Sequence, residues 1–155
     1  MKSKQELYDY AHSAASEVIR RGMQQMPMMA AVLEDGEIAI APCHNLPKDA
    51  LAHLHLIVSR ADGVRFVVLV MEAWVMEANT DDAGTRRILE LVSQGRLSLE
   101  SVPRRSEAVI FILREGAAIY MATCKIDRAG NALEKAALEE VDNKTTTGRF
   151  VKRGG

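Results

Sequence analysis

One acidic residue interrupts the most hydrophobic stretch of the sequence. Glu72 lies in the run from Val64 to Val75, whose length and β-branched residues predict a central strand. Alternate residues of a strand share a face, so Glu72 falls on the same face as Val70 and Trp74. A buried carboxylate is costly to desolvate unless it meets a cation or several hydrogen-bond donors. The sequence therefore predicts a basic partner for Glu72.

The candidate partners are arginines at the ends of neighbouring strands. Arg104 and Arg105 precede one predicted strand, and Arg128 follows the next. Arginine is favoured over lysine because its planar guanidinium donates two parallel hydrogen bonds to a carboxylate. Glu107, two residues after Arg105, would share its side of the strand. The cluster is then nearly balanced in charge, which disfavours a hydrolytic metal centre because such a centre needs an excess of carboxylates or imidazoles.

Two roles fit the predicted cluster of Glu72, Trp74, Arg105, Glu107 and Arg128. The favoured one is an ion-pair network that fixes strand register, with Trp74 as a core or interface aromatic residue. The alternative is a pocket in which Glu72 and an arginine orient a polar small molecule beside Trp74. No feature of the sequence places Glu72 and Glu107 around a common substrate, so we assign no catalytic residue.

The same part of the chain carries a resemblance to other proteins. Glu-Ala-Trp at 72–74, Pro-Arg-Arg-Ser-Glu-Ala-Val at 103–109 and Ile-Asp-Arg at 126–128 resemble the pattern of small bacterial and phage-type α+β proteins of unknown function. The resemblance covers residues 64–133 and implies an α+β fold, but no activity. Its matching positions are Glu72, Trp74, Arg105, Glu107 and Arg128.

Residues of the types that bind zinc occur close together in the sequence, namely Cys43, His44, His53 and His55. If residues 47–60 form a helix, the side chains of His53 and His55 point about 200° apart on it. Two zinc ligands on one helix need i,i+4 spacing instead. We therefore predict no metal and no cofactor, with a site built from Cys43, His44 and one of these histidines as the alternative. His12 is expected to face solvent.

Capping and turn signals define the helices and hairpins that must position these residues. A capping box at Ser3–Glu6 and a stop at Gly22 bound a first helix. A second helix runs from Pro47 to about Arg60 with Leu51, Leu54, Ile57 and Val58 as its buried stripe, and a third is expected at 80–94. Runs at 28–34 and 37–41 flank Asp35-Gly36, a pair typical of a type I′ hairpin. A second hairpin joins 108–113 to 117–127, the signals for 132–141 conflict between helix and strand, and a last short strand is expected at 149–151.

This order of elements predicts an α+β fold with a mainly antiparallel sheet of about five to six strands and two to three helices packed on one face. The 155 residues fit a single domain, 1–155. With 20 Lys+Arg against 21 Asp+Glu, the net charge of -1 argues against a surface built for nucleic-acid phosphates.

The chain also shows no hallmark of a membrane or exported protein. The longest apolar run, 66–71, is too short to span a bilayer, and the N-terminus has no apolar signal core. The two cysteines form no C-x-x-C pair. We therefore expect a soluble cytoplasmic protein with no membrane partner.

Without a catalytic motif, the sequence favours a non-enzymatic binding or assembly protein, acting as a homodimer that protects its strand edges. The alternatives are a small-molecule-binding protein or small enzyme that uses the Glu72 cluster, with a ligand the sequence does not identify, and a nucleic-acid-associated accessory protein.

Overall fold

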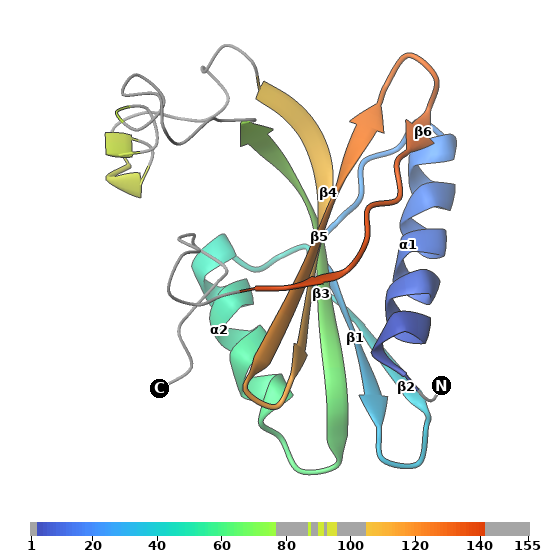
Figure 1. Ribbon diagram of the computed structural model, residues 1–155, viewed down its shortest axis with the longest axis vertical. Coiled ribbons are helices and arrows are strands. Elements are labelled where there is room, and N and C mark those ends of the chain that lie inside the picture. The colour runs from blue at the N-terminus through green and yellow to red at the C-terminus, as the bar shows by residue number, and fades with distance from the viewer. Residues whose placement is uncertain (1–2, 77–86, 88–89, 92, 96–104, 142–155) are drawn as a thin grey trace.

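The computed structural model describes residues 3–76, 87, 90–91, 93–95 and 105–141. In these residues two helices accompany a mainly antiparallel sheet, so the fold is α+β as predicted (Figure 1). Most of the predicted third helix at 80–94, most of the loop at 97–105 and the strand expected at 149–151 lie outside the described residues, although residues 87, 90–91 and 93 of the third helix are described and helical. The elements are α1 (Lys4–Arg20), β1 (Met28–Leu33), β2 (Ile38–Pro42), α2 (Lys48–Ser59), β3 (Val64–Met76), β4 (Arg105–Glu115), β5 (Ala118–Asp127), β6 (Ala132–Leu133) and β7 (Glu139–Glu140).

The boundaries of α1 follow the capping signals of the sequence. The hydroxyl of Ser3 accepts a hydrogen bond from the backbone N–H of Glu6 at 3.1 Å. At the other end Gly22, with φ 73°, donates to the carbonyl of Ile19, and Met23 donates to Val18. These two bonds form the Schellman motif that glycine favours after a helix.

The first hairpin forms around Asp35-Gly36, but its turn differs from the predicted type I′. A type I′ turn needs positive φ at both central residues, and Asn131 is the one non-glycine residue of the described chain with positive φ. The backbone instead closes a three-residue loop in which Gly36, with φ 87°, donates to the carbonyl of Leu33, and Leu33 donates to Glu37. This pattern fits a type I turn followed by a left-handed glycine.

The sheet has the strand order β2-β1-β3-β4-β5-β6, and β7 also pairs with β5. All its described pairs are antiparallel. The segment 132–141, for which the sequence signals conflicted, forms the two-residue strands β6 and β7. With these short strands the described part of the sheet has seven strands, slightly more than the predicted five to six.

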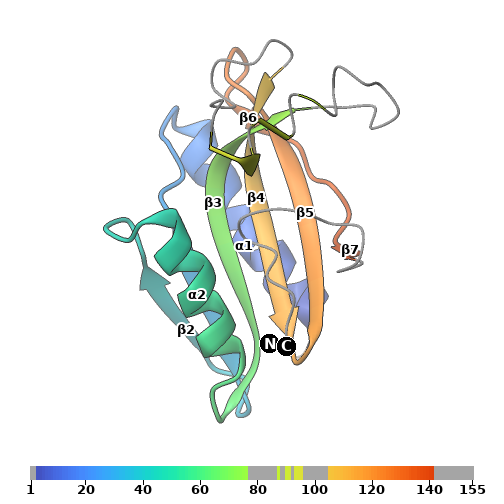
Figure 2. The same ribbon diagram turned by 90° about the vertical axis from the view of Figure 1, so that its left-hand side faces the viewer.

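The helices cover opposite faces of the sheet, so the prediction that they pack on one face is wrong. Figure 2 shows α2 in front of the sheet and α1 behind it. The reason lies in β3, which is apolar at both alternations and needs cover on both sides. On the α1 face its core residues are Phe66, Val68 and Val70, and on the α2 face they are Val67, Leu69 and Met71.

The buried side of α2 also departs from the predicted stripe. Leu51 is buried and Leu54 and Val58 pack partly against the sheet, as expected, but Ile57 is exposed. Ala52, His55 and Ser59 are buried instead. His55 therefore occupies a core position that an apolar residue would usually take.

Candidate functional site

Glu72 lies on the α1 face of β3, as its position in the strand predicted. Its carboxylate accepts a hydrogen bond from the backbone N–H of Gln25 at 2.6 Å. Gln25 belongs to the connection between α1 and β1. Glu72 thus ties the segment between α1 and β1 to β3.

Arg128 is the arginine that meets Glu72. It follows β5 by one residue, and its Nη2 donates to both carboxylate oxygens of Glu72 at 3.1 Å each. Its Nε donates to Glu107 at 2.8 Å, and its Nη1 donates to the carbonyl of Met23 at 3.2 Å. One guanidinium therefore joins β3, β4, the end of β5 and the segment after α1.

The other predicted members of the cluster are placed by the strand register alone. Trp74 lies directly opposite Glu107 in the β3–β4 pairing, so the two side chains share the α1 face, and Trp74 is half-buried. Arg105 pairs with Met76, and its side chain lies outside the described residues. Arg104 lies outside them altogether. The described cluster thus consists of Glu72, Glu107 and Arg128, with Trp74 beside Glu107.

The cluster is partly open to solvent and internally paired. The side chains of Glu72, Glu107 and Arg128 are 19%, 30% and 34% exposed. The hydrogen bond to Glu107 and the negative charge of Glu72 raise the pKa of Arg128 above its usual value. Each carboxylate is held by the same cation, which suits a structural tie better than proton transfer, since a general acid or base must be available to a substrate.

The cysteines and histidines that suggested zinc differ in burial and in the elements that hold them. Cys43 is buried on the α2 face, His44 and His53 are exposed and His55 is buried under α2. Burial raises the pKa of the Cys43 thiol. Within the described part of the chain, no group of three or more metal-binding side chains lies close enough together to hold a metal ion.

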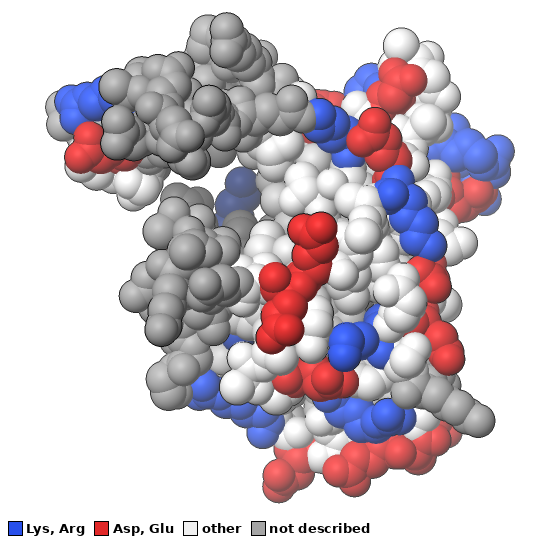
Figure 3. Space-filling model, in the orientation of Figure 1, with Lys and Arg blue, Asp and Glu red and all other residues white. Residues whose placement is uncertain are grey.

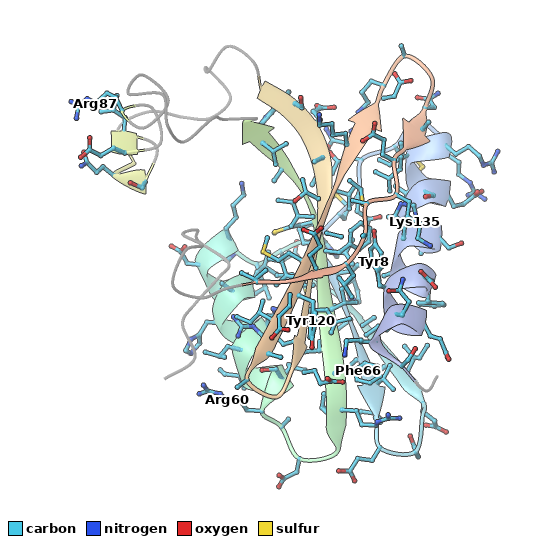
Figure 4. The ribbon with its side chains drawn as sticks, viewed as in Figure 1. Tyr8, Arg60, Phe66, Arg87, Tyr120 and Lys135 are labelled. Atoms are coloured by element: carbon cyan, nitrogen blue, oxygen red, sulfur yellow. The ribbon has the colours of Figure 1, made fainter. Side chains whose placement is uncertain are left out.

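A buried polar cluster between α1 and the sheet was not predicted. The hydroxyl of Tyr8 donates to the carbonyl of Ala136 and lies 3.3 Å from the Cys124 sulfur. His12 is buried, contrary to its predicted exposure, and its Nε2 lies 2.8 Å from the carbonyl of Glu134. These contacts bind segment 134–136 to α1, and Figure 4 shows Tyr8 and Lys135 close together on this side of the sheet. The sequence feature that indicates this cluster is the spacing of Tyr8 and His12, which lie four residues apart and so on the same side of the helix.

A second unpredicted pair, Arg114 and His55, lies on the opposite face. Arg114 is buried in β4 on the same alternation as Ile110 and Ile112, and His55 is buried in α2. The alternation argument that singled out Glu72 would also have singled out Arg114, because both charges interrupt an apolar strand face.

The face of the molecule drawn in Figure 3 carries mixed charge. In Figure 3, acidic and basic side chains of the described residues alternate along the α1 side, with uncharged surface between them. None of the described helices is both long and apolar enough to cross a membrane. Comparison of the chain with protein-family models, curated proteins and solved structures gives no significant match.

Proposed function

We propose that the protein is a non-enzymatic assembly protein that pairs with a second copy of itself along β2. The observation that carries the proposal is the position of β2 in the sheet. It pairs with β1 on one side, and it is the first strand of the sheet order, with no strand among the described residues on its other side (Figure 2). Such an edge presents backbone N–H and C=O groups to any strand that can approach.

The composition of β2 supports pairing with an identical strand. Its sequence Ile-Ala-Ile-Ala-Pro contains no charge, whereas edge strands that stay single usually carry lysine or another charged side chain. Ile40, near the middle of the strand, is 50% exposed. Two copies of β2 placed antiparallel are related by a two-fold axis, which closes the assembly as a dimer with one continuous sheet.

The interface would be modest in size. The strand has five residues and ends at Pro42, which has no N–H to donate. A strand pair this short covers less than the roughly 1,200 Å² of a stable complex unless neighbouring side chains add to it. Met26, exposed next to Pro27, can add to it, because the carbonyl of Pro27 accepts from Cys43 directly after β2. We therefore expect association that depends on protein concentration.

Two further features fit this role. Arg128 already donates hydrogen bonds to both carboxylates of the polar cluster, so the cluster connects elements within one copy of the protein. Cys43 and Cys124 are free and buried in cores on opposite faces of the sheet, which suits a protein of the reducing cytoplasm.

Light scattering coupled to size exclusion over a range of protein concentrations tests the dimer. Ile40→Lys places a lysine of each copy near the two-fold axis, and we expect it to abolish association because like charges meet across the strand pair. Ile57→Lys is the matched control, since Ile57 is equally exposed but lies on α2. A monomeric wild type at all concentrations, or loss of association in Ile57→Lys but not in Ile40→Lys, would contradict the proposal.

Partial exposure of the Glu72 cluster favours a second candidate function, the binding of a small polar molecule. Glu72, Glu107 and Arg128 together carry one net negative charge, so a small cation such as agmatine is the natural probe. Trp74, the single tryptophan of the chain, lies opposite Glu107 and reports binding by its fluorescence. A fluorescence change on titration that is lost in Glu107→Gln supports this role. An unchanged spectrum, or the same change in the variant, rejects it.

A further inference from the structure

Three buried side-chain atoms of the described residues have no hydrogen-bond partner, and all three belong to Arg114 and His55. They are Nε and Nη2 of Arg114 and Nδ1 of His55. Arg114 is 2% exposed and His55 is 0% exposed. Buried polar atoms in folded proteins are almost always satisfied, so three unpaired atoms on two residues call for an explanation.

The two residues adjoin the same position of the sheet. The Nε2 of His55 lies 3.2 Å from the carbonyl of Val67, and Arg114 is the register partner of Val67 across the β3–β4 pair. Directly opposite residues share a face, so the side chain of Arg114 lies on the α2 face with Val67. The unpaired atoms therefore lie on the α2 side of the sheet.

The charge of Arg114 is not compensated by any of the described residues. A guanidinium keeps its proton at neutral pH. Its register partners in the two adjacent strands, Val67 and Ile119, are apolar and buried. Among the described residues no carboxylate forms an ion pair with it. Burial, together with the positive charge of Arg60, lowers the pKa of Arg114.

The end of α2 does not supply the missing acceptors. The carbonyls of residues 56–58 already accept hydrogen bonds from residues 59–61. Arg60, at this end of α2 and on its outer side in Figure 4, brings a second positive charge instead. Arg60 therefore adds to the electrostatic cost of burying the charge of Arg114.

The unpaired donors of Arg114 have the geometry of an oxyanion site. Nε–H and Nη2–H lie on one edge of the guanidinium and point in parallel, which matches two oxygens of a single anion. In the Glu72 cluster the same two groups of Arg128 each donate to a carboxylate. In Arg114 both are unused, although it is the more deeply buried of the two arginines.

His55 offers a hydrogen-bond acceptor, whereas Arg114 offers donors. A carbonyl can only accept, so the Nε2 that contacts Val67 carries the hydrogen. Burial, reinforced by the charge of Arg114, lowers the pKa of His55 to about 4, so the ring is neutral at neutral pH. Nδ1 is then a lone-pair acceptor that lacks a donor.

We propose that Arg114 and His55 form a binding site for a small oxyanion that keeps one hydroxyl group, with hydrogen phosphate as the simplest example. Two oxygens of the anion accept from Nε and Nη2 of Arg114, and its hydroxyl donates to Nδ1 of His55. The site is separate from β2 and from the Glu72 cluster, so it stands whether or not the protein dimerises.

Thermal unfolding in phosphate, sulfate and chloride at equal ionic strength tests the site. Phosphate stabilises many proteins non-specifically, so the comparison that matters is between variants. We expect phosphate to raise the Tm of the wild type with saturation, and to do the same for Arg20→Met, which removes an exposed arginine of α1. Arg114→Met should lose the saturable shift, and sulfate, which has no hydroxyl at neutral pH, should act more weakly than phosphate.

Three outcomes would contradict the proposed site or part of it. An equal saturable shift in Arg114→Met and wild type would overturn the site, and so would the absence of any saturable phosphate effect in the wild type. Equal effects of sulfate and phosphate would refute the hydroxyl contact to His55. If Arg114→Met does not fold, Arg114→Lys serves in its place, because lysine keeps the charge but lacks the paired donors and should weaken the phosphate effect.

Discussion

Replacing Glu72 by glutamine tests how much the Arg128 tie contributes to stability. Glutamine keeps one carbonyl oxygen for the N–H of Gln25 but loses the charge that faces Arg128. Breaking a fully buried ion pair costs about 3–5 kcal/mol, and losing an exposed one costs about 0–1 kcal/mol. Glu72 is 19% exposed and Arg128 is 34% exposed. Because Arg128 also keeps its bond to Glu107, we expect a loss of about 1–2 kcal/mol.

The loss is measured as the free energy of unfolding from urea titrations, with Glu34→Gln as the control for an exposed glutamate on the surface. The double variant Glu72→Gln/Glu107→Gln sharpens the test, because it leaves Arg128 without any carboxylate. We expect its cost to exceed the sum of the two single costs. A loss in Glu72→Gln no larger than in Glu34→Gln, or strict additivity in the double variant, would refute the idea that one arginine is shared by two carboxylates.

Two other predictions concern the buried polar groups on either face. Tyr8→Phe removes the hydroxyl bound to the Ala136 carbonyl, and we expect a loss of about 1–2 kcal/mol in urea titrations, whereas Tyr10→Phe on the exposed side of α1 should change little. Equal losses in the two variants would contradict this role. For His55, the folded pKa of about 4 lies below the unfolded value near 6.5, so the unfolded chain binds more protons between these limits. Stability should therefore fall as the pH drops from about 6.5 to about 4, by roughly 3 kcal/mol, and His55→Gln should flatten this part of the curve. A variant whose pH profile matches the wild type would disprove the assignment.

The Glu72 cluster could be predicted because its logic is local. A charge within an apolar strand face needs a partner, and a guanidinium at a strand end is the best available one. Which of the three candidate arginines meets Glu72 depends on the lengths of the hairpins, and this the sequence did not decide. Arg114 is subject to the same rule, but it has no acidic partner in the described chain, so reasoning from ion pairs does not identify it.

Long-range packing explains the remaining differences. In β3 both alternations are apolar, and Val67, Leu69 and Met71 need cover as much as their neighbours do, so a sheet with helices on one face would leave them exposed. In 132–141 the helix-favouring alanine, leucine and glutamate residues are overridden, because Leu133 pairs with Ile126 and Ala136 binds Tyr8. These partners lie in β5 and α1, far away in the sequence, so the local helix propensity of 132–141 does not predict the pairing.

The contact between Tyr8 and Ala136 joins residues 128 positions apart and sets an order on folding. The apolar side of α1, with Leu7, Tyr8 and Ile19, shares its core with β1 and with strands that the ribosome makes much later, from β3 to β5. During synthesis α1 can meet β1 early, but its cover stays incomplete until β5 and the segment after it have emerged, and such non-local closure is slow. The first helix to be made is thus among the last to be completely covered, and a chain stopped before 134 would leave part of its apolar side exposed to aggregation or to chaperones.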